Sequence, residues 1–396
     1  MKINKWTLGL AAVGLVTLGS SANAEEKLSV VQTALSSTTL SGYVDVNAIW
    51  RSGTTGTAPN GNNAGPGRLY DVNQTGVSSQ DGFNLNVVSL TLDKPLDEGQ
   101  WSAGYHVQTL IGPGAVGRGT AVTSGSGSGI ALNEAYVALR APVGNGLDLK
   151  FGQFGTFVGY EAYDTYKNPN YSRSYGFFIE PSAHVGMTAS YVFADWISAM
   201  VGIGNSISPA IDARGAVESK KTYLTVITLT APESMGALKG STLSFGYDNG
   251  QQNGAFATTQ NLYIGATIAT PVTGLTVGLA YDYQSNGLQT GSWAQTFAMY
   301  LSYQATEKLK LNARGDFAKS STSAGNTAGP DGIIGTLDDL APFSQGVFYS
   351  GPVNMNYNNL FSFTLTADYS LWENVVTRAE LRWDHASKGT IGAGGV

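Results

Sequence analysis

The chain has 396 residues, of which 51 are glycine and none is cysteine, and its formal net charge is −6. Charged residues make up 13% of the chain, about half of the share that is usual in soluble domains. The absence of cysteine excludes disulfide bonds, thiolate metal sites and a cysteine nucleophile. A mildly acidic chain without a basic cluster gives no support for nucleic-acid binding.

Residues 1–24 have the pattern of a secretory signal peptide. Lys2 and Lys5 give the positive start, residues 8–18 form a short apolar run, and residues 22–24 read Ala-Asn-Ala, an A-x-A cleavage site. An N-terminal membrane helix is the alternative interpretation, but the apolar run is too short to span a bilayer. We therefore expect an exported protein.

Period-two alternation of apolar and polar residues predicts a series of strands along the rest of the chain. The clearest case is the hairpin 259–284, in which Leu275, Val277 and Leu279 share one face and small or polar residues fill the other. Each arm has about ten alternating residues, which is longer than most globular strands and enough for a tilted strand to cross a bilayer. The predicted strands are residues 40–50, 83–93, 101–111, 132–141, 147–154, 184–193, 197–204, 221–231, 241–248, 259–268, 275–284, 293–303, 309–317, 360–369 and 375–384.

The connections between these strands alternate in length, and residues 25–37 precede them as a lead-in on the periplasmic side. Connections after odd-numbered strands are mostly long and polar, whereas those after even-numbered strands have about three to nine residues, which is the asymmetry of bacterial outer-membrane barrels. Short turns place a proline after the strand and a glycine later, as in Pro271 and Gly274. A secreted soluble β-protein is the alternative, but apolar residues on the outer faces argue against it.

These patterns predict an all-β fold over residues 38–396: a transmembrane antiparallel up-and-down β-barrel of about sixteen strands. Single-chain bacterial barrels have an even number of strands with both ends in the periplasm, whereas the fifteenth predicted strand ends on the outer side. We therefore expect a closing strand that this sequence lacks at its C-terminal end. The alternative is a miscount that leaves fourteen strands. A bulge is expected in the second strand, because its apolar phase switches between Val87 and Val88.

Charges on the inward faces of the predicted strands are the candidates for pore-lining residues. Rings of such charges set the ion selectivity of a channel. Alternatively, opposite charges on adjacent strands pair with each other and only hold the wall together. Because the candidates include both positive and negative charges, the pattern does not decide whether the channel prefers anions or cations. The candidates are Glu134, Arg140, Asp148, Lys150, Lys310, Arg314, Asp316, Arg378, Glu380 and Arg382.

The long loop of residues 155–181, after the fifth predicted strand, is the candidate constriction. It carries four further candidate charges, Glu161, Asp164, Arg173 and Glu180, next to several tyrosines. Aromatic side chains beside charges suit contacts with sugars or peptides. The alternative is a loop that packs over the barrel or reaches a neighbouring subunit.

The sequence gives little support for metal binding or catalysis. Asp331, Asp338 and Asp339 in the longest predicted loop have spacings that could offer oxygens to calcium. They do not match an EF-hand loop, and a solvated acidic turn is the simpler interpretation, so we expect no cofactor. Catalysis would need a base beside a nucleophile, or paired acids. The three histidines of the chain show no such local pattern, so we expect no enzyme.

Several segments resemble the second family of β-barrel porins, which are outer-membrane proteins of Gram-negative bacteria. They are LSGYVDVNAIW, FNLNVVSLTLDKPLDEGQWSAGY, AYVALRAPVGNG, NPNYSRSYGFFIEP and LTAPESMG. The resemblance covers roughly residues 38–385 and implies a pore for small hydrophilic solutes. The loop of residues 155–181 follows the fifth predicted strand, as the inward-folded loop does in general porins. The family pattern would end in a strand with a terminal aromatic residue, which this sequence does not have.

The residues and this resemblance together predict an outer-membrane porin for passive diffusion of small hydrophilic solutes or ions. The expected partners are outer-membrane lipid and lipopolysaccharide, and further copies of the chain in a homotrimer. The alternative is a surface-exposed or adhesive barrel that conducts little. Polar inner faces with many small residues favour the open lumen over this alternative.

Overall fold

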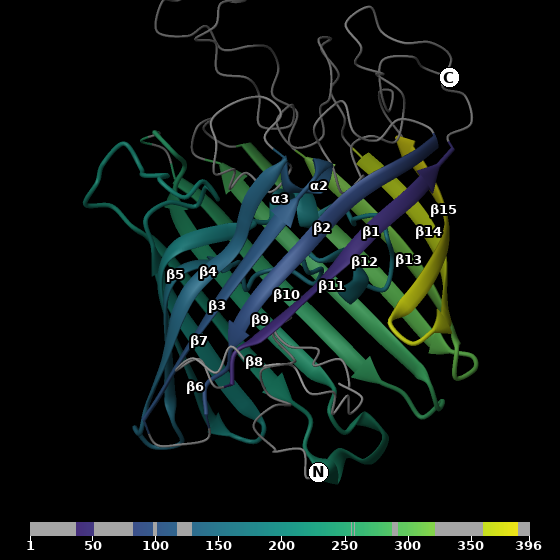
Figure 1. Ribbon diagram of the computed structural model, residues 1–396, viewed down its shortest axis with the longest axis horizontal. Helices are drawn as coiled ribbons and strands as arrows, with labels where there is room; N and C mark the ends of the chain where they lie inside the picture. Colours follow the sequence, from purple (N-terminus) through teal and green to yellow (C-terminus); the bar gives the residue numbers. More distant parts are fainter. Residues whose placement is uncertain are drawn as a thin grey trace, which may run out of the picture.

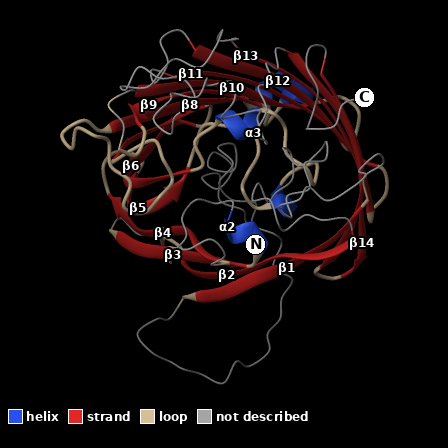
Figure 2. Ribbon diagram, turned by 90° about the horizontal axis from the view of Figure 1, so that it is seen from above, coloured by secondary structure: helices blue, strands red, loops and turns tan. Residues whose placement is uncertain are grey.

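The computed structural model describes residues 37–50, 82–97, 101–116, 129–254, 256, 258–286, 292–320 and 359–386. In these residues, fifteen strands form one antiparallel sheet in which each strand pairs with its neighbours in the chain. Figures 1 and 2 show the tilted strands around an interior that holds short helices and loops. The strands are β1 (Thr39–Ile49), β2 (Gly82–Lys94), β3 (Ser102–Ile111), β4 (Ile130–Ala141), β5 (Leu147–Gly155), β6 (Ala183–Ala194), β7 (Ile197–Gly204), β8 (Thr222–Thr230), β9 (Thr242–Gln251), β10 (Thr258–Ala269), β11 (Leu275–Asn286), β12 (Ser292–Gln304), β13 (Leu309–Ser320), β14 (Asn359–Trp372) and β15 (Val375–Ala386).

The strands turn their apolar side chains outward, as the alternation predicts. On β12, the outward residues Phe297, Met299 and Leu301 are between 37% and 46% exposed, whereas Thr296 and Ala298 are buried on the inner face. Large apolar side chains are exposed in the same way on strands from β1 to β15. A continuous apolar outer surface over small and polar inner residues is typical of a barrel wall in contact with lipid.

A bulge in β2 directs two successive residues into the interior. The register with β1 shifts between Asp45 and Val46, which leaves Asn86 as the extra residue of the ladder. Both Asn86 and Val87 are buried, as expected when a bulge re-aims side chains. The sequence predicts the phase change at Val87–Val88, and the observed bulge lies one residue before that position.

A second bulge, in β4, was not predicted. The register with β3 shifts between Gln108 and Thr109, and Asn133 is the extra residue. The side-chain amide of Gln153 on β5 donates hydrogen bonds to the main-chain carbonyls of Leu132, at 2.7 Å, and Asn133, at 3.2 Å. Within a bilayer, a carbonyl that leaves the ladder needs such a donor, so this glutamine stabilises the bulge.

The predicted hairpin 259–284 is confirmed as β10 and β11, which are paired in register along their whole length. Its turn closes with a hydrogen bond from the Leu275 N–H to the Val272 carbonyl at 3.0 Å. Gly274 has a φ of 81°, a left-handed conformation that glycine adopts without the steric cost of a side chain. The proline and glycine of this turn therefore do what the sequence pattern indicates.

The described sheet has β1 and β15 as its two edge strands. Because neighbouring strands are antiparallel, these two odd-numbered strands run in the same direction. The predicted fifteen strands are confirmed, and the alternative of fourteen is wrong. A sixteenth strand stays a prediction, because residues 387–396 lie outside the described residues, as do residues 1–36. In the described part of the chain, no helix is long and apolar enough to cross a membrane.

Candidate functional site

One long loop, residues 156–182 between β5 and β6, lies inside the barrel; we call it the inner loop. It contains the short 3-10 helix η2 (Thr165–Lys167) and the single-turn helix α3 (Gly176–Ile179). Figure 2 shows α3 within the ring of strands. The sequence left open whether the loop of residues 155–181 enters the lumen, and the structure places it there.

The inner loop begins with apolar and aromatic contacts to the barrel wall. Phe157 is buried in a cluster with Met200 of β7 and Val226 of β8. Tyr160 stacks on Tyr300 of β12, with ring centroids 4.4 Å apart. These contacts hold the first residues of the loop against the strands before its polar part crosses the interior.

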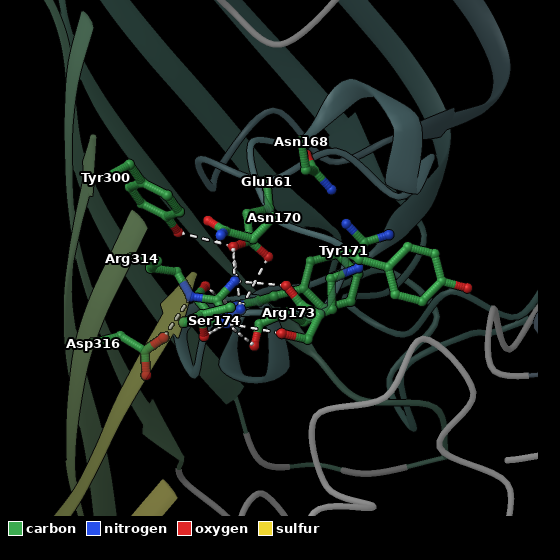
Figure 3. A network of polar contacts seen from close by, with 12 residues as sticks. Glu161, Asn168, Asn170, Tyr171, Arg173, Ser174, Tyr300, Arg314 and Asp316 are labelled. Atoms are coloured by element: carbon green, nitrogen blue, oxygen red, sulfur yellow. Dashed lines mark hydrogen bonds and ion pairs between the residues drawn. The ribbon is translucent and has the colours of Figure 1, made fainter. Parts of the chain in front are cut away.

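Arg314 of β13 is the centre of the charged contacts that hold the inner loop (Figure 3). Its buried guanidinium lies 2.7 Å from Asp316 and 3.1 Å from Glu161 of the loop. The same group donates to the main-chain carbonyl of Ser172 at 2.6 Å, and Glu161 also accepts a hydrogen bond from the Tyr300 hydroxyl at 3.0 Å. A buried charge with several partners is stable only while all of them are present, so these residues act as one unit.

Two charged side chains of β15 bind the backbone of the inner loop. The carboxylate of Glu380 accepts hydrogen bonds from the N–H groups of Tyr171, at 2.6 Å, and Ser172, at 3.0 Å. The guanidinium of Arg382 donates to the main-chain carbonyl of Arg173 at 2.5 Å. Hydrogen bonds to charged groups are stronger than neutral ones, and these bonds fix the loop against β15.

Arg378, nearer the start of β15, holds the region of η2. It donates to the main-chain carbonyls of Thr165 and Asn168, each at 2.9 Å. Its Nε lies 3.0 Å from the carboxylate of Asp368 on β14. The arginine therefore links two wall strands to the inner loop.

Asp164 fixes the other side of the inner loop to the first strands. It accepts hydrogen bonds from the hydroxyl of Tyr43 on β1 at 2.8 Å and from the amide of Gln108 on β3 at 3.1 Å. Burial opposes its ionisation, but the Lys167 ammonium at 2.8 Å and these hydrogen bonds outweigh burial and hold the pKa of Asp164 below its usual value. The carboxylate is therefore charged at neutral pH.

Glu180 forms a carboxyl pair with Asp282 of β11 at the end of the inner loop. The two groups lie within hydrogen-bonding distance of each other. Burial raises the pKa of Glu180 well above its usual value, and the negative charge of Asp282 raises it further. A Cβ atom on Gly159 would overlap the Glu180 carboxyl group, and one on Gly176 would lie 2.5 Å from the Asp282 carboxyl group. The pair is thus enclosed between two glycines of the loop.

Four of the other candidate residues lie together on the inner faces of β4 and β5. Arg140 and Asp148 form an ion pair with two hydrogen bonds of 2.6 Å, and their side chains stay 26% and 17% exposed. The Lys150 ammonium lies 4.5 Å from the ring centroid of Tyr136, and Glu134 is half-buried on the same strand as this ring. The structure therefore places charges of both signs on this part of the wall.

The remaining candidates lie elsewhere. Lys310 is opposite Asp368 in the ladder between β13 and β14. Asp331, Asp338 and Asp339 lie outside the described residues, so the calcium hypothesis stays untested. Among the residues that the structure describes, no three acidic, histidine or cysteine side chains are grouped so that they could hold a metal ion.

Several residues that hold the inner loop were not among the sequence candidates. They are Tyr43, Asn86, Gln108 and Asp282. All except Asn86 occupy inward positions of regular strands, so the alternation already indicated their direction. Their roles were missed because alternation says nothing of which loop residue a side chain will meet.

Comparisons with known proteins agree with this architecture. A family model described as "Putative beta-barrel porin-2, OmpL-like" matches residues 37–395. The outer membrane channel DcaP of Acinetobacter baumannii has a TM-score of 0.52 and 12% sequence identity, over 89% of this chain and 91% of that chain. The anion-selective porin from Comamonas acidovorans has a TM-score of 0.52 and 11% identity, over 88% and 89%. No curated protein matches the chain. At these identities, the solved structures show a shared fold alone.

Proposed function

Because the chain belongs to the OmpL-like beta-barrel porin-2 family of outer-membrane channels, we propose that it lets small hydrophilic solutes cross the outer membrane by passive diffusion, with the inner loop as the constriction. The observation that carries this proposal is the position of the inner loop. Ion pairs and hydrogen bonds tie the inner loop to β1, β3, β13 and β15, so residues of the barrel wall hold it in its inward position.

The charges of the wall support a pore without a strong preference for one sign. Arg140 and Asp148 neutralise each other where they are partly exposed. The charges of Arg314 and Glu161 are buried in a contact between wall and loop. Rings of unpaired charge would select ions strongly, whereas paired charges leave the size of the passage as the main filter.

The assembly and location of the protein follow from the same proposal. The apolar outer face suits outer-membrane lipid and the acyl chains of lipopolysaccharide. We also propose that residues 1–24 direct export as a signal peptide and that three copies form a homotrimer, on the grounds of the sequence pattern and the family. Chemical cross-linking of the purified protein in detergent should give a ladder that ends at the trimer.

Single-channel recording in planar lipid bilayers tests the proposed function. Protein extracted from outer membranes should give stable conductance steps, in multiples of three for a trimer, and a small reversal potential under a salt gradient. Folding is checked independently by heat modifiability, the change in gel mobility that a folded barrel shows on boiling. Folded protein that inserts and passes no current would overturn the proposal and favour a surface-exposed barrel.

A further inference from the structure

Tyr171 of the inner loop connects the first strands of the sheet to the last one. Its hydroxyl accepts hydrogen bonds from the amides of Asn47, at 2.7 Å, and Asn86, at 3.1 Å, and donates to Asp45 at 3.1 Å. Its main-chain N–H donates to Glu380 of β15 at 2.6 Å. Figure 3 shows its ring directed away from the cluster around Arg314. One residue thus reaches both edge strands of the described sheet.

The hydroxyl of Tyr171 lies in a site built for it. A phenol has one proton to donate and can accept at its lone pairs, and here it donates to one carboxylate and accepts from two amides. The bulge in β2 is what places Asn86 in this site, fully buried and 2.6 Å from Asp45. The bulge in β2 therefore supplies one of the hydrogen bonds that hold the inner loop.

In the described residues no ladder joins β1 to β15, and the hydrogen bonds of Tyr171 tie the inner loop to both strands. We infer that Tyr171 is a positioning residue, a brace whose hydroxyl and N–H fix the inner loop between the two edge strands and so set the width of the pore. The effect on pore width rests on the proposed function, whereas the brace itself does not. The hydroxyl acts on the pore indirectly, through the position of the loop.

The brace can be tested without any current measurement. Because the chain has no cysteine, Ser174→Cys introduces a single thiol at a buried position of the inner loop. Its rate of modification by a small methanethiosulfonate reagent, followed by mass spectrometry, reports how often the loop leaves the wall. Adding Tyr171→Phe should raise this rate roughly tenfold, because it removes the hydrogen bonds that join the hydroxyl to Asp45, Asn47 and Asn86. Tyr223→Phe, on the exposed outer face of β8, is the matched control and should leave the rate unchanged.

Two further measurements separate the brace from a general loss of stability. Asp45→Asn should raise the rate by itself, and should add little to Tyr171→Phe, because both act on one hydrogen-bonded group. In bilayers, Tyr171→Phe should increase open-channel current noise while the protein stays folded by heat modifiability. An unchanged modification rate in both variants would overturn the inference. A raised rate in a protein that passes no current would support the brace and overturn the proposed function.

Discussion

The carboxyl groups of Glu180 and Asp282 lie within hydrogen-bonding distance of each other inside the barrel, where the inner loop returns to the wall. Two carboxylates this close cannot both be ionised at low cost. A shared proton makes the contact attractive. Raising the pH removes the proton and leaves two negative charges face to face.

The first prediction concerns pH. The pKa of Glu180 in the folded protein lies above its ordinary value of 4.5. Its contribution to stability is therefore complete below that ordinary value and is lost as the pH rises through the raised pKa. The free energy of unfolding, measured by urea titration in detergent between about pH 5 and about pH 8, should fall as the pH rises. Glu180→Gln keeps a donor for Asp282 and should reduce this dependence.

Glu307→Gln is the control for this experiment, because Glu307 is exposed in a turn between β12 and β13. It should leave the pH dependence as in the unmodified protein. The same pH dependence in the Glu180→Gln variant would show that other groups cause it.

The second prediction concerns the buried charge of Arg314. Arg314→Met keeps much of the volume but leaves Asp316 and Glu161 without their cation. Removal of one partner from a buried ion pair costs about 3–5 kcal/mol, so the free energy of unfolding in detergent should fall by that order. Arg214→Met, at an exposed position in the connection between β7 and β8, should change it little. Equal losses in both variants would contradict the role of Arg314 as the centre of the loop contacts.

The third prediction uses a pair of glycines. Gly159 and Gly240 both have left-handed backbone, with φ of 115° and 79°, so alanine at either costs roughly 1–2 kcal/mol for conformation. At Gly240 a Cβ would meet no atom within 4 Å, whereas at Gly159 it would overlap the Glu180 carboxyl group. Gly159→Ala should therefore lower the heat-modification temperature more than Gly240→Ala. Equal shifts would mean that Glu180 moves aside without cost.

The fourth prediction concerns ion selectivity. Asp148→Asn leaves the Arg140 guanidinium without its ion-pair partner on the inner wall, so the reversal potential under a salt gradient should shift towards anion preference. Arg140→Gln should shift it towards cation preference. The double variant restores neutrality and should return close to the value of the unmodified channel. Shifts of one sign in both single variants would mean that neither charge faces the path of ions.

The strands could be predicted from sequence because alternation repeats over many residues. The segment 293–303 became Ser292–Gln304, and 309–317 became Leu309–Ser320. The added residues pair with neighbouring strands, as Gln304 does with Lys310 and Ala318 with Thr296. The bulge at Asn133 was missed, since Asn133 is the second residue of the predicted strand 132–141, and a single residue before it cannot show a change of phase.

The contacts inside the barrel were harder to predict. Alternation gave the inward direction of Arg314, and Glu161 lay in the candidate loop. Their ion pair joins positions 153 residues apart, and nothing local in the sequence encodes such a distance. Glu380 presents a second difficulty, because it binds main-chain N–H groups, which every residue except proline carries.

Several charged side chains of the wall bind the main chain of the inner loop. Glu380 accepts a hydrogen bond from the N–H group of Ser172, and Arg314 donates one to the carbonyl of the same residue. Arg378 donates hydrogen bonds to the carbonyls of Thr165 and Asn168. These groups remain whatever side chain the position carries. These positions of the loop can therefore accumulate substitutions over evolutionary time, which in the proposed pore would alter the passage, while the barrel keeps the loop in place.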